Sequence, residues 1–243
     1  MNGDLVVIPT YNEAENLQRL VETVLAQGLF DVLIVDDNSP DGTGAIGDGL
    51  HDVHPERVVV LHRAGKQGLG TAYRAGFSYA LARGYERVFE MDADFSHDPR
   101  ALPHLRAALD ASDMVLGSRY APGGATKNWP IWRRLLSQGG SLYAALILGL
   151  PFHDLTGGFK GLSARVLQTL DLDAIQSNGY AFQIEVTFRA YRSGFRIAER
   201  PITFVDRRLG KSKMRLAIVG EAIRIVWALR FGSLSASFQE ARP

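Results

Sequence analysis

Two carboxylates one residue apart, Asp92 and Asp94, follow an apolar run at residues 88–91. The run predicts a buried strand of a parallel sheet, and open α/β sheets bind ligands at the carboxyl ends of such strands. Like charges this close repel one another unless a cation lies between them or each has its own partner. Since Mg²⁺ is commonly held by one or two carboxylates together with substrate phosphates, the pair predicts a metal site for a diphosphate ligand.

Two of these features also fit a purely structural interpretation. The acidic stretch can be a turn that leads into a helix, because Asp98-Pro99 is typical of a helix start. The glycine-rich stretch at residues 65–70 can bind phosphate, or it can be an ordinary turn between a strand and a helix. The sequence leaves both alternatives open.

Short apolar runs alternate with segments of helical periodicity along the first half of the chain. The runs predict strands at residues 5–8, 32–35, 58–61, 88–91 and 113–117. The segments between them predict helices at 13–27, 43–54, 71–83, where Thr71 is the expected cap, and 101–109. This alternation predicts an α/β fold with a doubly wound, mostly parallel sheet flanked by helices. One edge of that sheet then gathers Tyr11, Glu13, Asp37, Lys66, Asp92 and Asp94.

The pattern changes after residue 118. A nearly continuous apolar segment at 142–150 predicts either a buried helix or a helix that lies among lipid headgroups, where the nearby Trp and Arg residues are favoured. A helix at 182–193, a strand at 196–204 and a last, widely apolar helix at 216–231 follow. The basic loop at 207–213 fits a solvated surface loop or a lid whose cations close over phosphates.

Composition excludes several classes of protein. With 243 residues and 46% apolar residues, the chain can form one large α/β domain with a real core. The net charge of +1 gives no general attraction to nucleic acid. The absence of cysteine excludes disulfides and thiol catalysis. Without a signal peptide pattern or a run of ~18–20 apolar residues, a cytoplasmic protein with peripheral membrane contact is expected.

Several motifs occur together in a fixed order. They are residues 7–17 (VIPTYNEAENL), 35–43 (VDDNSPDGT), 91–99 (MDADFSHDP), 117–120 (GSRY), 128–130 (NWP) and 210–214 (GKSKM). In this combination the chain resembles the polyprenol-phosphate (dolichol-phosphate) mannosyltransferases, which are inverting glycosyltransferases of family 2 with a GT-A fold. The resemblance covers about residues 4–215. It implies GDP-mannose as donor, a polyprenyl monophosphate lipid as acceptor, and Mg²⁺ or Mn²⁺ as cofactor.

The resemblance also implies roles for individual residues. The nucleotide-sugar positions are Pro9, Tyr11, Glu13, Val35, Asp37, Lys66, Asp92, Ala93, Asp94, Arg207 and Lys211. Metal ligands are expected at Asp92 and Asp94, and at Ser96, where some relatives carry glutamine. The acceptor phosphate is expected at Arg119, Arg133 and Ser137, and the catalytic set at Asp94, Arg119, Arg133 and Lys211. Some relatives carry an arginine where this chain has Val205, and Arg207 or Arg208 is the expected replacement.

The resemblance divides the chain into a catalytic domain at residues 1–214 and an amphipathic helix and tail at 215–243. The nucleotide-binding half is expected at about 1–118 and the acceptor-binding half at about 119–214. The cytoplasmic face of the membrane, reached directly or through a membrane-protein partner, is the expected place of action. A lipid phosphate is already an anion and needs no strong general base, although Asp154 is a candidate for one.

Two other functions remain open. The first is a transferase that moves glucose or N-acetylglucosamine from a UDP-sugar to the same kind of lipid. The second is a nucleotide-binding subunit without catalytic activity, which recruits partners to a membrane.

Overall fold

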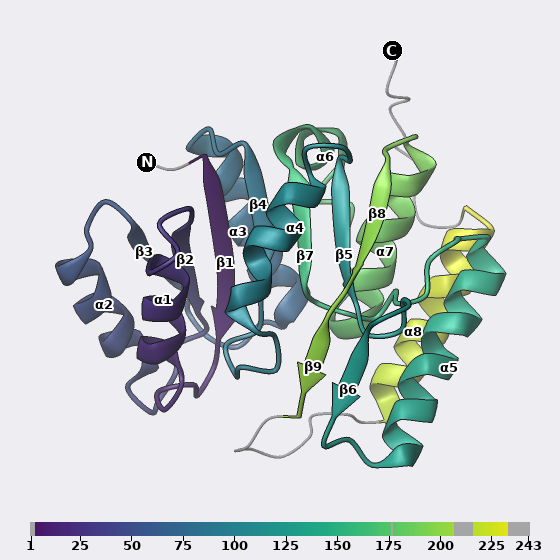
Figure 1. Cartoon of the computed structure of the whole chain (residues 1–243), viewed down its shortest axis with the longest axis horizontal. Coiled ribbons are helices and arrows are strands. Elements are labelled where there is room, and N and C mark those ends of the chain that lie inside the picture. The colour runs from purple at the N-terminus through teal and green to yellow at the C-terminus, as the bar shows by residue number, and fades with distance from the viewer. Residues whose placement is uncertain (1–2, 176, 207–215, 233–243) are drawn as a thin grey trace.

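The apolar runs of the first half form neighbouring parallel strands. The computed structural model describes residues 3–175, 177–206 and 216–232. The strands of its main sheet are β1 (Asp4–Thr10), β2 (Asp31–Asp36), β3 (Val58–His62), β4 (Arg87–Glu90), β5 (Met114–Ser118), β7 (Lys160–Ser163) and β8 (Ile197–Pro201). Within the described residues these seven strands follow the order β3-β2-β1-β4-β7-β5-β8 (Figure 1). The expected mostly parallel α/β sheet is confirmed.

Strand β7 was not expected, and it is the antiparallel member of the sheet. It lies between β4 and β5 and pairs antiparallel with both. Its four residues include a lysine and a glycine, so it lacks an apolar run. A Cβ atom at Gly161 would lie 2.8 Å from the ring of Phe89 and 3.0 Å from Val115. A small residue is therefore needed for the backbone to fit between its neighbours.

Helices cover both faces of the sheet, as the alternating pattern predicts. Helices α1 (Leu17–Leu25), α2 (Thr43–Val53) and α4 (Leu102–Ala108) contribute to one apolar core. Helices α3 (Leu69–Ala82), α6 (Ala164–Thr169) and α7 (Gly179–Arg192) contribute to a second core on the opposite face. Two layers of helices thus enclose a buried sheet (Figure 1).

Several expected element boundaries were wrong. Helix α1 begins at Leu17 rather than at residue 13, after a turn. Helix α3 begins at Leu69 with Gly68 as its cap, while the Thr71 hydroxyl donates to the Gly68 carbonyl oxygen within the first turn. The expected strand at 196–204 is two strands, because β9 (Thr203–Val205) leaves the main sheet to pair with β6 (Ala125–Lys127). The Asp98 cap is confirmed: its carboxylate accepts from the Arg100 N–H at the start of η1 (Pro99–Ala101).

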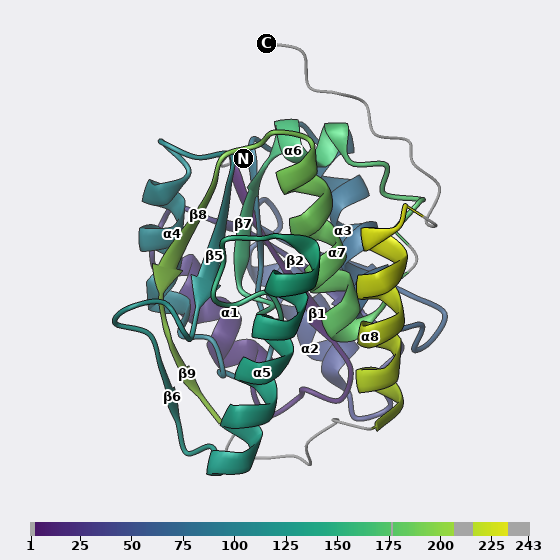
Figure 2. The same cartoon turned by 90° about the vertical axis from the view of Figure 1, so that its right-hand side faces the viewer.

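Helices α5 (Ile131–Leu148) and α8 (Leu216–Arg230) lie side by side outside α7 (Figure 2). They share a third apolar cluster with α7, to which Ala144, Leu148, Val226 and Leu229 contribute. The opposite sides of both helices expose large apolar side chains. In the described part of the chain, none of the helices has the length and apolar character needed to cross a bilayer.

Candidate active site

A cavity of about 380 Å³ opens where the parallel strands end. Loops after β1, β2 and β4 meet there with the first turns of α3 and α7 and with one side chain of α5. The cavity is lined by nine residues that the sequence assigned to the site: Pro9, Tyr11, Glu13, Asp37, Lys66, Asp92, Ala93, Asp94 and Arg133. These residues come from both halves of the expected catalytic domain. The structure therefore brings most of the predicted site together.

One end of the cavity combines an aromatic ring with charged groups. The Lys66 ammonium lies 4.1 Å from the centre of the Tyr11 ring. Asp37 forms an ion pair of 3.2 Å with Arg63. Burial raises the pKa of Asp37 above its ordinary value, even though the Arg63 charge acts in the opposite direction. An aromatic face beside a carboxylate acceptor is suited to stacking and hydrogen bonding with a nucleoside.

The first turns of α3 and α7 both face the cavity, through Gly68 and Leu69 and through Gly179 and Tyr180. The free N–H groups at a helix start carry partial positive charge and favour phosphate. Glycine at position 70 allows the start of α3 to pack closely against the residues before α7, because a Cβ atom at Gly70 would lie 2.5 Å from the Ser177 carbonyl oxygen. The glycine-rich stretch thus has a packing role and also borders the cavity.

The two central carboxylates lie in a turn rather than on β4, which ends at Glu90. The Ser96 N–H donates to Asp94 Oδ1 at 3.0 Å, and the Asp92 N–H donates to His97 Nδ1 at 3.3 Å. Burial lowers the pKa of His97 to about 4, so a neutral ring accepts this bond. The ring of His97 stacks on Phe159 at 4.9 Å. Sequence reasoning missed this positioning role of His97, because the histidine has no metal-ligand or catalytic spacing.

The donor set fits a hard divalent cation that also binds phosphate. Among the described residues, no group of three or more His, Asp or Glu side chains is placed to hold a metal ion. Asp92 and Asp94 line the cavity with oxygen ligands. Two carboxylates completed by phosphate oxygens and water are a usual site for Mg²⁺. Ser96 is buried and does not line the cavity, and a metal contact of its hydroxyl stays a prediction.

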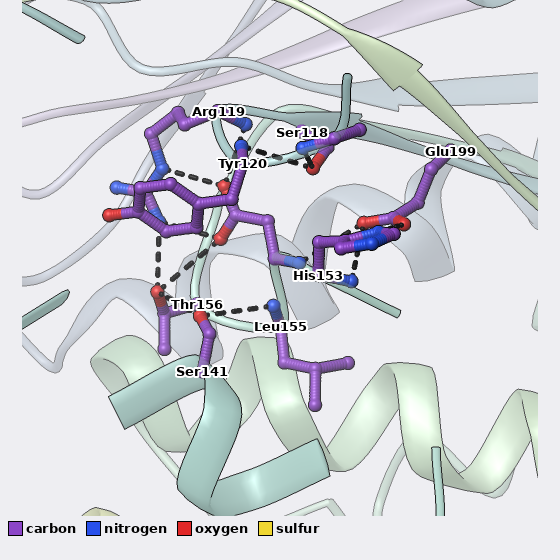
Figure 3. A network of polar contacts seen from close by, with 10 residues as sticks. Ser118, Arg119, Tyr120, Ser141, His153, Leu155, Thr156 and Glu199 are labelled. Carbon is purple, nitrogen blue, oxygen red and sulfur yellow. Dashed lines mark hydrogen bonds and ion pairs between the residues drawn. The ribbon is translucent and has the colours of Figure 1, made fainter. Parts of the chain in front are cut away.

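Arg119 lies behind the cavity wall instead of in the cavity. Its Nε and Nη2 atoms each donate to one oxygen of Asp154 at 2.7 Å, and Nη2 also donates to Thr156 Oγ1 at 2.8 Å (Figure 3). Both charged side chains are buried. Burial alone would raise the pKa of Asp154, but Arg119 outweighs it and holds that pKa below its ordinary value. Asp154 is therefore the ion-pair partner of Arg119.

Arg133 is the arginine that reaches the cavity. Its Nη1 donates to Asp206 Oδ1 at 2.8 Å, and its guanidinium lies 4.4 Å from the centre of the Trp129 ring. Ser137 lies one turn further along α5 and does not line the cavity. The Val35 side chain is buried in the core, so only its main chain can face a ligand. Arg207, Arg208 and Lys211 lie outside the described residues.

A buried polar group below the cavity was also missed by the sequence reasoning. The Gln183 amide lines the cavity and donates to Glu90 Oε2 at 2.7 Å. Lys160 pairs in register with Glu90, and its ammonium donates to the Gln183 carbonyl oxygen and to Thr187 Oγ1. Burial raises the pKa of Glu90 and lowers that of Lys160. Within a sequence, isolated charges of this kind cannot be told from surface charges.

The chain belongs to glycosyl transferase family 2, whose model matches residues 5–171. It is 50% identical over 231 residues to the polyprenol monophosphomannose synthase of Mycolicibacterium smegmatis, covering 93% of this chain and 87% of that one. It is 52% identical over 223 residues to the undecaprenyl-phosphate mannosyltransferase of Micrococcus luteus, covering 90% of each.

Among solved structures, the fold is similar to that of the glucosyl-3-phosphoglycerate synthase of Mycobacterium tuberculosis, crystallised with Mn²⁺, UDP and glucosyl-3-phosphoglycerate. The TM-score is 0.67 at 18% identity, covering 94% of this chain and 80% of that one. At this identity the likeness concerns the fold alone, and it agrees with the expected GT-A architecture.

Proposed function

We propose that this protein transfers mannose from GDP-mannose to a polyprenyl monophosphate, with inversion, giving polyprenyl phosphate β-mannose and GDP. Two relatives with about half of their residues identical carry names that state mannosyl transfer to polyprenyl-type acceptors. The observation that carries the proposal is the position of α5. Its Arg133 lines the cavity, while Ile131, Trp132 and Leu135 of the same turns are exposed. This arrangement suits an acceptor with a phosphate head and an apolar tail.

The donor occupies the cavity in this proposal. Its nucleoside lies beside Tyr11, Glu13 and Asp37, and its diphosphate faces the first turns of α3 and α7. A divalent cation, Mg²⁺ or Mn²⁺, would be held by Asp92 and Asp94 and would supply positive charge for the departing diphosphate. Lys66 adds a cation from this chain, and Lys211 and Arg207 are proposed to add two more.

The acceptor phosphate binds Arg133, whose guanidinium can engage two phosphate oxygens at once. In this position it holds the attacking oxygen in line with the leaving diphosphate. Because the acceptor is an anion at neutral pH, this step needs no proton transfer and no general base. Arg119 then acts as a positioning residue, since it holds Thr156, which lines the cavity.

The lipid tail reaches the bilayer along the exposed faces of α5 and α8. Exposed apolar side chains on these faces and directly after α8 are Ile131, Trp132, Leu135, Leu136, Leu142, Leu146, Ile223, Trp227 and Phe231. Exposed Arg134, Arg224 and Arg230 lie on the same helices. Tryptophan and arginine are favoured at a headgroup boundary with anionic lipids. We therefore propose peripheral binding to the cytoplasmic face of the membrane.

Transfer of radiolabelled mannose from GDP-mannose to polyprenyl phosphates, with and without EDTA, tests the proposal directly. The expected product is a labelled lipid that forms only with a divalent cation. The same assay with UDP-glucose and UDP-N-acetylglucosamine in place of GDP-mannose shows which nucleotide sugar is the donor. Transfer from a UDP-sugar alone would replace the mannosyl assignment, and nucleotide binding without any transfer would indicate a recruitment subunit.

A further inference from the structure

Three consecutive backbone N–H groups in the loop after β1 are bound by side chains of the loop after β2 and of the first residue of α2. The distances are 3.1 Å from the Asn12 N–H to Ser39 Oγ, 2.9 Å from the Glu13 N–H to Thr43 Oγ1 and 3.1 Å from the Ala14 N–H to Asp41 Oδ2. All three acceptors belong to the motif at residues 39–43 (SPDGT). None of them lines the cavity, whereas Tyr11 and Glu13 of the bound loop do.

The direction of each hydrogen bond follows from where the hydroxyl protons go. Ser39 Oγ donates its proton to Asp36 Oδ1 at 2.6 Å, and Thr43 Oγ1 donates its proton to Asp41 Oδ1 at 2.5 Å. Each hydroxyl oxygen is then left as an acceptor for a backbone N–H. Burial raises the pKa of Asp41, but the hydrogen bonds from Thr43 and Ala14 outweigh it and hold that pKa below its ordinary value. An ionised Asp41 carboxylate can only accept hydrogen bonds. The direction of the hydrogen bonds that join Asp41, Thr43 and the loop after β1 is therefore fixed.

The bound loop has a backbone that needs such support. Asn12 in this loop has φ +59°, and Asn38 in the loop after β2 has φ +57°, both in the left-handed region. Side-chain-bearing residues in this region persist when the surrounding structure holds them there. The two loops thus fix one another, and the conformation of residues 11–13 depends on the motif.

We infer that Ser39, Asp41 and Thr43 are positioning residues that hold Tyr11 and Glu13 ready for the nucleoside. Because the loop is ordered before the ligand arrives, binding does not have to order it. This inference rests on the proposed function, in which the cavity binds a nucleotide. It assigns a role in donor affinity to a motif that does not touch the donor.

The test compares Thr43→Val with Thr43→Ser in the full chain. Valine keeps the shape of the buried side chain but removes the hydroxyl, and serine keeps the hydroxyl. We expect Thr43→Val to raise the dissociation constant for GDP in the presence of Mn²⁺ by about tenfold, which is ~1.4 kcal/mol. The turnover number at saturating donor and the KM for the lipid should stay unchanged. Thr43→Ser should bind GDP as the unchanged protein does.

A matched control is Thr169→Val in α6, where the hydroxyl donates to the Arg165 carbonyl oxygen within one helix. It should leave GDP affinity unchanged. If Thr43→Val does not fold, Asp41→Ala serves instead, because Asp41 is exposed. Unchanged affinity in a folded Thr43→Val or Asp41→Ala protein, or an equal loss in Thr43→Ser, overturns the inference. If the unchanged protein binds neither GDP nor UDP, the proposed function itself fails; if it binds UDP, the same comparison is made with UDP.

Discussion

Arg119 and Asp154 form a buried ion pair with two parallel hydrogen bonds of 2.7 Å, enclosed by aromatic rings. The guanidinium lies 5.1, 5.5 and 5.6 Å from the ring centres of Tyr120, Trp129 and Phe204. A charge in such surroundings depends on its partner, since water cannot replace it. The pair therefore fixes the wall that carries Thr156.

Removing the charge of Asp154 should destabilise the protein severely. Asp154→Asn leaves the Arg119 charge buried without a counter-charge, which costs roughly 3–5 kcal/mol. Denaturant unfolding measures this loss. Since folding lowers the Asp154 pKa, its contribution to stability is present above the ordinary value of 3.8 and is lost as the pH falls through the folded value. The variant should lack this part of the acid dependence; equal stability at neutral pH would contradict the assignment.

Asp94→Ala should nearly abolish transfer while the fold remains intact. The aspartate lines the cavity, and loss of one well-placed electrostatic contact to a leaving group lowers turnover by roughly 100- to 1000-fold. Initial rates with GDP-mannose, together with the melting temperature, measure the two effects separately. Asp48→Ala, on an exposed part of α2, is the control. Normal turnover by Asp94→Ala would refute the metal assignment.

Arg133→Gln should weaken binding of the acceptor lipid and leave binding of the donor nucleotide nearly unchanged. Charged hydrogen bonds to phosphate are worth ~1.5–3 kcal/mol, so we expect the KM for polyprenyl phosphate to rise roughly 10- to 100-fold. The dissociation constant for GDP, measured by calorimetry, should change little. The neighbouring Arg134 is exposed and does not line the cavity, which makes Arg134→Gln the matched control. An equal effect of both variants would argue against a specific phosphate site.

Polar substitutions on the exposed face of α5 should reduce membrane binding. Trp132 and Leu135 are 61% and 64% exposed. Replacing both by serine removes apolar area that would enter the headgroup region, and we expect binding to anionic phospholipid vesicles to fall at least roughly tenfold. Co-sedimentation measures binding. Val53 is 70% exposed on α2, and Val53→Ser should bind vesicles as before. Unchanged binding of the double variant would exclude this face as the contact.

Chelation separates the role of the metal from the stability of the fold. EDTA should stop transfer and leave the melting temperature nearly unchanged, because the described carboxylates include no cluster that would need a cation in order to fold. Addition of Mg²⁺ or Mn²⁺ in excess should restore transfer. Full activity in EDTA would remove the metal from the proposal.

The sequence predicted the parts of the site that depend on local pattern. Apolar runs place strand ends at one edge, so Tyr11, Asp37 and Asp94 were expected together, and they line one cavity. The depth of a side chain depends on packing between distant segments, which periodicity does not describe. The family resemblance implied that Arg119 contacts phosphate, whereas in the structure it lies under aromatic rings supplied partly by residues 129 and 204.

Strand β7 could not be predicted from the sequence, because its residues also depend on packing against distant segments. A central strand is usually recognised by its apolar run, whereas the stretch at 160–163 contains a lysine that pairs in register with Glu90 and a glycine required by Phe89. Both residues make sense only beside β4. The pairing that explains them joins positions 70 residues apart, as in Glu90 with Lys160.

The place of β7 has a consequence for how the polypeptide matures. In the sheet, β4 and β5 are joined only through β7. The backbone N–H and C=O groups on their facing edges therefore lack hydrogen-bond partners until residue 163 has left the ribosome. A fragment truncated near residue 118 would expose the open backbone edges of β4 and β5 and would aggregate instead of folding. The first 118 residues therefore cannot be excised as an autonomous module.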